Sequence, residues 1–442
     1  MTLEIDNTIY RRPVELLQQL IRFDTSNPPG NERECVSYIG HLLESMNIET
    51  HMLSKDPHRP NLVARLKGVK GTPPLLLYGH VDVVPAPEPD WTYPPFDGTI
   101  ADGFVWGRGA LDMKGAVAMM VSAFMKARAN NVRLPGDVVL CILSDEEELG
   151  DYGARFLVEH HPELFKDIRY ALGEVGGFTF YISGKKFYFI EVAQKQKCGI
   201  KAIIHGTSGH ASSHAQGGTM VKLAAFLEQL DNIRLPVHIT PAVEKMFKPL
   251  ADALGFPSGW ILRQLLKPKR TDFILKILGK GGDAFVPMFH NTVNATVVRG
   301  GNKINAIPSE VEVQMDVRLL PGLGPDDVIR ELRPLIGKDI ELELLFYDKG
   351  PTELDMGLFD TLAGFLKEAD PEGIPIPILM TGSSDARFFS RLGIQTYGFM
   401  PMQLPEDMRF NRILHSVNER IPVETLEFGT NVLYQTMQRF FE

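Results

Sequence analysis

Short apolar runs alternate with amphipathic segments along the first part of the chain. The apolar runs predict β-strands over 61–66, 74–80, 137–144, 168–173 and 187–194. Helical spacing of apolar residues, or a helix-forming composition, predicts α-helices over 13–23, 32–46, 114–130 and 151–160. Strands that alternate with helices are typical of an α/β fold, so we expect a mixed, mostly parallel sheet with helices on both faces.

The pattern changes after about residue 195. A strand at 198–205 and a helix at 217–232 precede a stretch rich in Pro, Lys and large apolar residues. That stretch, 236–287, predicts two or three short helices. Two further strands, 294–299 and 310–319, alternate apolar with polar residues. Helices and hairpin-type strands without a regular β-α rhythm predict a smaller, inserted α+β domain.

The α/β rhythm resumes after about residue 320 and a helix at 325–335. The expected elements are strands at 340–346, 376–380 and 394–399 and helices at 357–369 and 423–441. The chain of 442 residues is also longer than one hydrophobic core usually supports. We therefore expect a discontinuous first domain formed by 1–195 and 321–442, with the second domain inserted at 196–320.

Composition excludes several classes of protein. The net charge is −9 and basic residues form only local clusters, so nucleic acid is not an expected partner. The three cysteines are widely spaced, which predicts no disulfide framework and a reducing, cytoplasmic setting. Residues 1–12 lack the apolar segment of a secretory signal, and no apolar run reaches about 18 residues. A membrane partner is therefore not expected.

Ionisable residues stand where predicted strands end. His80 closes the apolar run at 75–80, and Asp82 follows two residues later. A histidine at the end of a buried strand can bind a metal, and a carboxylate nearby can orient its ring. Asp112 lies in a glycine-rich turn at 107–115, just before a helix-forming run. A helix N-cap is the alternative role for Asp112.

Three later segments add further carboxylates and a histidine. The apolar strand at 138–143 runs directly into Asp145, Glu146, Glu147 and Glu148. A solvated acidic loop is the ordinary interpretation of such a run. Here a buried strand delivers carboxylates that repel one another, which favours neutralisation by cations. Glu174 follows the strand at 168–173 between glycines, and His415 lies in a loop near the C-terminus.

Together these five segments resemble the family of dinuclear zinc amidohydrolases and peptidases that includes succinyl-diaminopimelate desuccinylase, acetylornithine deacetylase, aminoacylase and glutamate carboxypeptidase. The resemblance covers nearly the whole chain. It implies that one zinc ion binds to His80, Asp112 and Glu174, and the other to Asp112, Glu147 and His415. It further implies that Asp82 orients His80 and that Glu146 is the general base. Cobalt or manganese could substitute for zinc.

The same resemblance implies that the inserted domain is a lid and that two chains form a homodimer through it. His210, in the segment 206–212, would stabilise the tetrahedral oxyanion and could come from the partner subunit. A histidine that begins a helix after a turn is the structural alternative. The helices expected at 236–287 exceed the smallest family members; their apolar residues Trp260, Ile261, Leu265 and Leu266 are expected to form a small core rather than a binding surface.

The resemblance also implies substrate contacts from both domains. Arg318 would bind a substrate carboxylate with two parallel hydrogen bonds. An ion pair of Arg318 with Asp316 or Glu310 is the competing interpretation. The remaining expected contacts are Asn305, Ser384 and Arg387.

The predicted activity is hydrolysis of an amide bond in a small carboxylate-bearing substrate. The candidate classes are a dipeptidase, a carboxypeptidase and an N-acyl-amino-acid deacylase. A catalytically silent binding protein with the same fold is the alternative from another class. A serine hydrolase is disfavoured because no Gly-x-Ser-x-Gly segment stands at the end of a predicted strand.

Overall fold

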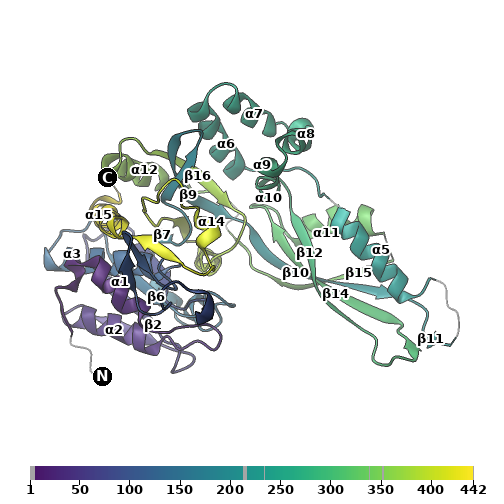
Figure 1. Ribbon diagram of the computed structural model, residues 1–442, viewed down its shortest axis with the longest axis horizontal. Helices are drawn as coiled ribbons and strands as arrows, with labels where there is room; N and C mark the ends of the chain where they lie inside the picture. The colour runs from purple at the N-terminus through teal and green to yellow at the C-terminus, as the bar shows by residue number, and fades with distance from the viewer. Residues whose placement is uncertain (1–4, 213–216, 233, 338, 351–352, 442) are drawn as a thin grey trace. The chain divides into compact units, whose positions relative to one another are not determined.

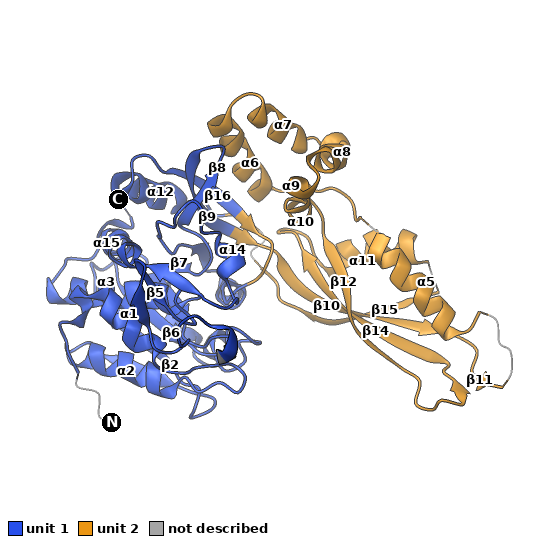
Figure 2. Ribbon diagram, viewed as in Figure 1, with its two compact units in different colours: residues 1–192, 355–378, 384–442 blue, residues 193–354, 379–383 orange. Residues whose placement is uncertain are grey.

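The computed structural model describes residues 5–212, 217–232, 234–337, 339–350 and 353–441. The chain forms two compact units (Figure 2). Unit 1 comprises residues 1–192, 355–378 and 384–442, and unit 2 comprises residues 193–354 and 379–383. Within the described residues, no helix has both the length and the apolar character needed to cross a membrane.

Unit 1 is built on a nine-stranded sheet (Figure 1). Its strands, in spatial order, are β1 (Thr50–Leu53), β2 (Asn61–Leu66), β6 (Val138–Leu143), β3 (Leu75–His80), β7 (Tyr170–Gly173), β17 (Gln395–Gly398), β9 (Lys185–Gln194) and β16 (Ile374–Met380), and β8 (Phe178–Ile182) pairs with β9. Strands β6, β3, β7 and β17 are parallel, and the flanking strands β1, β2 and β9 pair antiparallel. The predicted mixed sheet is confirmed.

Helices cover both faces of this sheet. On one face, α4 (Ala154–His160) and α13 (Ala386–Phe389) pack over a cluster that includes Tyr78 and Leu143. On the other, α3 (Lys114–Ala129) packs against β3 and β6, and α2 (Arg33–Glu44) against β1 and β2. A second layer, α1 (Pro13–Ile21) and α15 (Val423–Arg439), lies on α3. Burial on both faces explains why β3 is a continuous apolar run.

The parallel strands bring three loops to one edge of the sheet. His80, the last residue of β3, is the register partner of Leu143, the last residue of β6. Leu77 pairs with Leu172, one residue before the end of β7. The segments that follow these strands therefore begin side by side, at the carboxyl edge where parallel sheets bind ligands.

Unit 2 contains a four-stranded antiparallel sheet of β12 (Thr292–Gly300), β14 (Glu310–Leu319), β10 (Gln196–His205) and β15 (Glu341–Tyr347). Helices α5 (Thr219–Asn232) and α11 (Pro325–Ile336) cover one face. The predicted return to the first domain at residue 321 is wrong, because β15 pairs with β10 and α11 packs on the same sheet. An apolar strand pattern does not specify the sheet that the strand joins. The chain returns from unit 2 to unit 1 near residue 354 instead.

The segment expected to hold two or three helices forms five: α6 (Pro241–Leu254), α7 (Ser258–Leu265), α8 (Pro268–Leu278), α9 (Lys280–Asp283) and α10 (Val286–Phe289). The rings of Phe247 and Phe289 pack together at its centre. Leu265 is buried, but Trp260 is 55% exposed and does not belong to the expected small core.

Short elements complete the fold. In unit 1 they are β4 (Thr99–Ala101), β5 (Phe104–Trp106), β18 (Arg420–Pro422), α12 (Phe359–Ala369), α14 (Phe410–Ile413) and the 3-10 turns Ile9–Arg11, Glu88–Asp90, Pro162–Phe165 and Ser390–Leu392. In unit 2 they are β11 (Gly209–His210) and β13 (Ala306–Ile307), which pair with each other.

Candidate metal centre

His80 lies at the centre of a buried group of carboxylates in unit 1. Its side chain is 1% exposed at the end of β3. The ring atom Nε2 lies 3.2 Å from Asp112 Oδ1 and 3.4 Å from Glu174 Oε2. The residues predicted to bind one metal ion are thus brought together from three segments that are far apart in the sequence.

The second predicted group forms around His415. Its Nε2 lies 3.1 Å from Asp112 Oδ2 and 3.2 Å from Glu147 Oε2. The two oxygens of Asp112 therefore face two different imidazoles. Asp112 is the residue that the two groups share.

The donor atoms have a spacing that fits bound metal ions. Ligands about 2.0–2.1 Å from a tetrahedral zinc ion lie about 3.3 Å from one another, close to the contacts above. Ligand atoms of His80, Asp112 and Glu147 all lie within 4.8 Å of each other, as do those of His80, Glu146 and Glu174. Among the described residues, the buried Oε1 of Glu147 has no hydrogen-bond partner. Two imidazoles and several carboxylates are a suitable ligand set for divalent cations.

Asp82 connects His80 to the acidic loop. Its Oδ1 lies 3.4 Å from His80 Nδ1, and its backbone carbonyl lies 3.0 Å from the same nitrogen. The carboxylate also accepts hydrogen bonds from the backbone N–H groups of Glu146 (3.1 Å) and Glu147 (3.0 Å) and from the Asn27 side chain (2.9 Å). Asp82 therefore holds both the imidazole and the loop that carries Glu146 and Glu147.

Glu419, which the sequence analysis missed, holds the turn that carries Asp112. Its Oε1 accepts hydrogen bonds from the N–H groups of Leu111 (2.7 Å) and Asp112 (3.0 Å). Its Oε2 accepts from Gly109 N–H (3.1 Å) and from Arg108 (2.8 Å). Glu419 is fully buried. Glu419 lies only four residues after His415, which was the one hint in the sequence. Its hydrogen bond with Gly109, 310 residues away, could not be predicted from spacing.

The charges in the centre favour added positive charge. The carboxylates of Asp112 and Glu147 raise the pKa of His415 to about 10. Burial lowers the pKa of His80, but Asp112, Asp82 and Glu174 outweigh it and raise that pKa well above its usual value. Burial raises the pKa of Glu147 to about 7. The same carboxylates that hold protons on the imidazoles would attract divalent cations, which bind in exchange for such protons.

Glu146 and Asp385 are acids with strongly perturbed pKa values near this centre. Burial, and then the charge of Glu174, raises the pKa of Glu146 well above its ordinary value. Burial raises the pKa of Asp385 to about 8 against the opposing effect of Arg387. Neither oxygen of Asp385 has a hydrogen-bond partner among the described residues. The sequence did not predict Asp385, because its raised pKa results from burial and not from a local pattern.

The loops of the centre contain strained backbone. Asp145, Val175 and His415 have φ angles of 70°, 63° and 58°. Positive φ is unusual for any residue except glycine, and for β-branched Val175 it is a true outlier. Such strain is found where the surrounding structure fixes a functional geometry.

Unit 2 places its predicted residues differently. His210 is exposed in β11, and its Nδ1 lies 2.7 Å from Ser212 Oγ. Asn305 is exposed, and its backbone carbonyl accepts a hydrogen bond from Ala211 N–H. Arg318 pairs with Asp316 through two contacts of 2.7 and 3.1 Å and donates to Ser383 Oγ at 2.9 Å. The structure thus has the competing ion pair with Asp316.

Ser384 and Arg387 lie in unit 1 and support its loops. Ser384 Oγ accepts a hydrogen bond from Ala386 N–H at 3.2 Å. Arg387 is 7% exposed and donates to the carbonyl of Leu149 at 3.1 Å. The segment that contains both residues therefore braces the acidic loop after β6.

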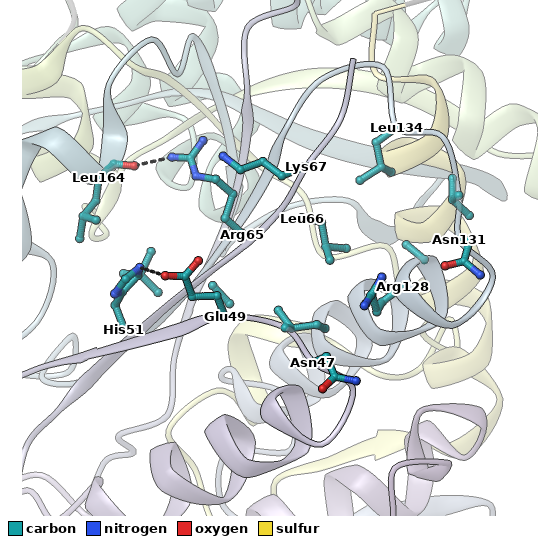
Figure 3. Close-up of a pocket in the computed structure, with 15 residues that line it drawn as sticks. Asn47, Glu49, His51, Arg65, Leu66, Lys67, Arg128, Asn131, Leu134 and Leu164 are labelled. Atoms are coloured by element: carbon teal, nitrogen blue, oxygen red, sulfur yellow. Dashed lines mark hydrogen bonds and ion pairs between the residues drawn. The ribbon is translucent and has the colours of Figure 1, made fainter. Parts of the chain in front are cut away.

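A cavity of about 500 Å³ lies elsewhere in unit 1, beside β2 and the end of α3 (Figure 3). Apolar Leu66 and Leu134 and basic Arg65, Lys67 and Arg128 line it. Arg65 is already engaged with Asp137 and with the carbonyl of Leu164. None of the predicted site residues lines this cavity.

Comparison with known proteins defines the class of this centre. Residues 76–439 match the model of Peptidase family M20/M25/M40, so the chain belongs to this family. The chain is an enzyme of a metal-dependent hydrolase family whose members act on amide bonds. The resemblance inferred from the five segments is confirmed.

Three relatives illustrate the match. The chain is 33% identical over 439 residues to succinyl-diaminopimelate desuccinylase of Wolbachia pipientis, covering 97% of this chain and 93% of the relative. It is 28% identical over 379 residues to the Homo sapiens N-fatty-acyl-amino acid synthase/hydrolase PM20D1, covering 83% and 74%. An M20 family metallo-carboxypeptidase from Sulfolobus solfataricus has the same fold, with a TM-score of 0.66, 18% identity and coverage of 97% and 99%.

Proposed function

We propose that the chain hydrolyses the amide bond of N-acyl amino acids with the help of two zinc ions held in unit 1. The observation that carries this proposal is Asp112, whose two oxygens face His80 and His415 separately. A carboxylate that is shared in this way is suited to bridge two cations.

The ligand roles follow from the two groups of contacts. His80, Asp112 and Glu174 would hold one ion, and Asp112, Glu147 and His415 would hold the other. Zinc suits a mixed set of imidazoles and carboxylates, and cobalt or manganese are candidate substitutes. When bound, two such ions supply a water molecule of lowered pKa and polarise the scissile carbonyl.

Glu146 is the proposed general base. Asp82 fixes its backbone N–H, and burial together with the charge of Glu174 raises the pKa of its carboxylate. A carboxylate with raised proton affinity can accept the proton of the attacking water and then deliver it to the leaving nitrogen. Glu147, the next residue, contacts His415 instead. These contacts support the assignment of the base to Glu146 rather than to its neighbour.

His210 is proposed to stabilise the oxyanion. The backbone N–H of Ser212 points at His210 Nδ1 at 3.3 Å, which makes Nδ1 an acceptor. In the neutral ring the proton then lies on Nε2, so this nitrogen remains as a donor for a developing negative charge.

Arg318 is proposed to bind the substrate carboxylate, with Asn305, Ser384 and Arg387 as supporting residues. Its contacts to Asp316 and Ser383 use three of the five N–H donors of a guanidinium. Asp316 would therefore orient Arg318 rather than exclude a second carboxylate.

Unit 2 is also the proposed dimer interface, in its role as the lid. Met220 and Val221 of α5 are 48% and 62% exposed, and Val298 of β12 is 50% exposed. An edge strand and a helix with exposed apolar residues are suited to pair with a second copy of the chain.

N-acyl amino acids are favoured over dipeptides because the names of two relatives, an N-fatty-acyl-amino acid synthase/hydrolase and a succinyl-diaminopimelate desuccinylase, describe such chemistry. The test is free-amine release from a panel of N-acyl amino acids and dipeptides. The enzyme is stripped with a chelator and reloaded with zinc, cobalt or manganese. We expect N-acyl substrates to be cleaved only by reloaded enzyme. Substrate binding without amine release would favour the silent binding protein, and activity that survives the chelator would overturn the proposal.

A further inference from the structure

The helical segment of unit 2 exposes large aromatic side chains. Phe256, Phe273 and Trp260 are 88%, 66% and 55% exposed, the highest values among the Phe and Trp residues that the structure describes. Ile277 is 63% exposed. These four residues lie in or next to α7 and α8. Single apolar residues are common on protein surfaces, whereas a group of large ones is typical of an interaction site.

In α8 (Pro268–Leu278), the side chains of Phe273 and Ile277 face away from the rest of unit 2. Thr271 and Leu275 are buried, one turn apart. Phe273 and Ile277 follow each of them by two residues, which is about 200° around the helix axis. Lys269 lies one turn before Phe273 on the same side, and Lys276 lies between Phe273 and Ile277. The solvent face of α8 is therefore apolar and aromatic with lysines beside it.

In α7 the same arrangement recurs. Leu262 is buried, and Trp260 precedes it by two residues on the opposite side. Arg263 lies one turn after Trp260 on the exposed side, where it pairs with Asp252. Phe256 precedes the helix.

The charge of this segment opposes that of the whole chain. Residues 241–289 contain eight Lys or Arg and four Asp or Glu, a net charge of +4. The rest of the chain contains 38 basic and 51 acidic residues, a net charge of −13. Asp272, the one acidic residue of α8, pairs with Arg234. Within the described chain, Lys267, Lys269 and Lys276 have no carboxylate within ion-pair distance.

We propose that the exposed face of α7 and α8 binds the surface of an anionic phospholipid bilayer. Aromatic and branched apolar side chains enter the boundary between headgroups and acyl chains, and lysines beside them reach anionic headgroups. A basic patch on an acidic protein is attracted only to a surface of opposite charge, and that attraction falls with salt. This proposal departs from the expectation of no membrane partner, which considered only spanning segments and secretion signals. It does not depend on the proposed reaction.

The test is co-sedimentation of the purified full chain with vesicles. We expect binding to vesicles of phosphatidylcholine with phosphatidylglycerol, at least about 10-fold weaker binding to phosphatidylcholine alone, and loss of binding in high salt.

The double variant Trp260→Ser/Phe273→Ser should reduce binding by at least about 10-fold. The charge variant Lys269→Glu/Lys276→Glu should do the same without removing apolar surface. The matched control Leu344→Ser/Phe346→Ser removes exposed apolar residues of β15 in unit 2, which are 50% and 44% exposed, and its binding should match the wild type.

Three results would overturn the proposal. One is the absence of wild-type binding to anionic vesicles in low salt. Another is equal binding by the control and by both variants, once thermal unfolding shows that all are folded. The third is a dissociated oligomer in either α7–α8 variant, measured by sedimentation velocity, because it would assign this face to a second copy of the chain.

Discussion

The candidate metal centre of unit 1 and the predicted substrate residues of unit 2 are built in opposite ways. In unit 1, His80 and His415 each meet carboxylates from segments that are distant in the sequence, and most of these groups are buried. In unit 2, the nearest partners of His210 and Arg318 lie two residues away, at Ser212 and Asp316, and Arg318 also donates to Ser383. The fold of unit 1 assembles a preformed centre, whereas unit 2 presents single oriented groups. Substitutions in the two units should therefore differ in what they disturb.

The largest expected effect is loss of turnover in Glu146→Gln. A general base contributes about 10²–10⁴-fold to the rate, so kcat should fall by that factor. Metal content should be unchanged, because the proposed ligands remain. Steady-state kinetics together with elemental analysis measures both quantities.

The matched control for this variant is Glu148→Gln. Glu148 is exposed in the same loop, two residues from Glu146. Its kcat should equal that of the wild type. A similar loss in both variants would mean that the charge of the loop matters, and not the position of one base.

The next largest effect is expected for His210→Ala in unit 2. Removing one oxyanion donor costs about 10²–10³-fold in kcat. His210 is exposed, and among the described residues its ring hydrogen-bonds to Ser212, so metal content and thermal stability should stay at wild-type values. Wild-type turnover in His210→Ala would remove this residue from the mechanism and leave the reaction to unit 1 alone.

A smaller effect is expected for Asp82→Ala in unit 1. Loss of a residue that orients a metal ligand typically costs about 10–100-fold in metal affinity or rate. Asp82 also holds the N–H groups of Glu146 and Glu147, so both quantities should fall together. Competitive zinc titration and kinetics on the same preparation measure them. A change in rate with unchanged zinc affinity would contradict the role of Asp82 beside His80.

The smallest effect concerns Lys195, a buried cation of unit 2. Its Nζ donates to the carbonyl of His290 and to Thr292 Oγ1, and burial lowers its pKa to about 7. The unfolded chain, with a lysine pKa of about 10.4, then binds more protons than the folded chain between about pH 7 and about pH 10. The free energy of unfolding should therefore rise with pH in this window. Lys195→Met should flatten that rise in urea unfolding, and an unchanged slope would refute the lowered pKa.

The sequence predicted the α/β and α+β character of the two units from local patterns, and the residues that it proposes as metal ligands lie together in the structure. Apolar strands that end in His80, the acidic loop and Glu174 converge by the topology of a parallel sheet alone. The domain boundary near residue 354 was not predictable, because β15 pairs with β10, a strand far away in the sequence. Glu419 and Asp385 were missed for the same reason. Their roles depend on long-range contacts and burial, which the spacing of residues in the sequence does not reveal.

The measurement that tests the central claim most directly is the number of zinc ions bound per chain in the wild type, His80→Ala and His415→Ala. If unit 1 holds two ions that share Asp112, dialysed wild-type protein should retain about two zinc ions and each variant about one or fewer. Equal zinc content in the wild type and His80→Ala would contradict the assignment of His80, and with it the proposed two-metal centre.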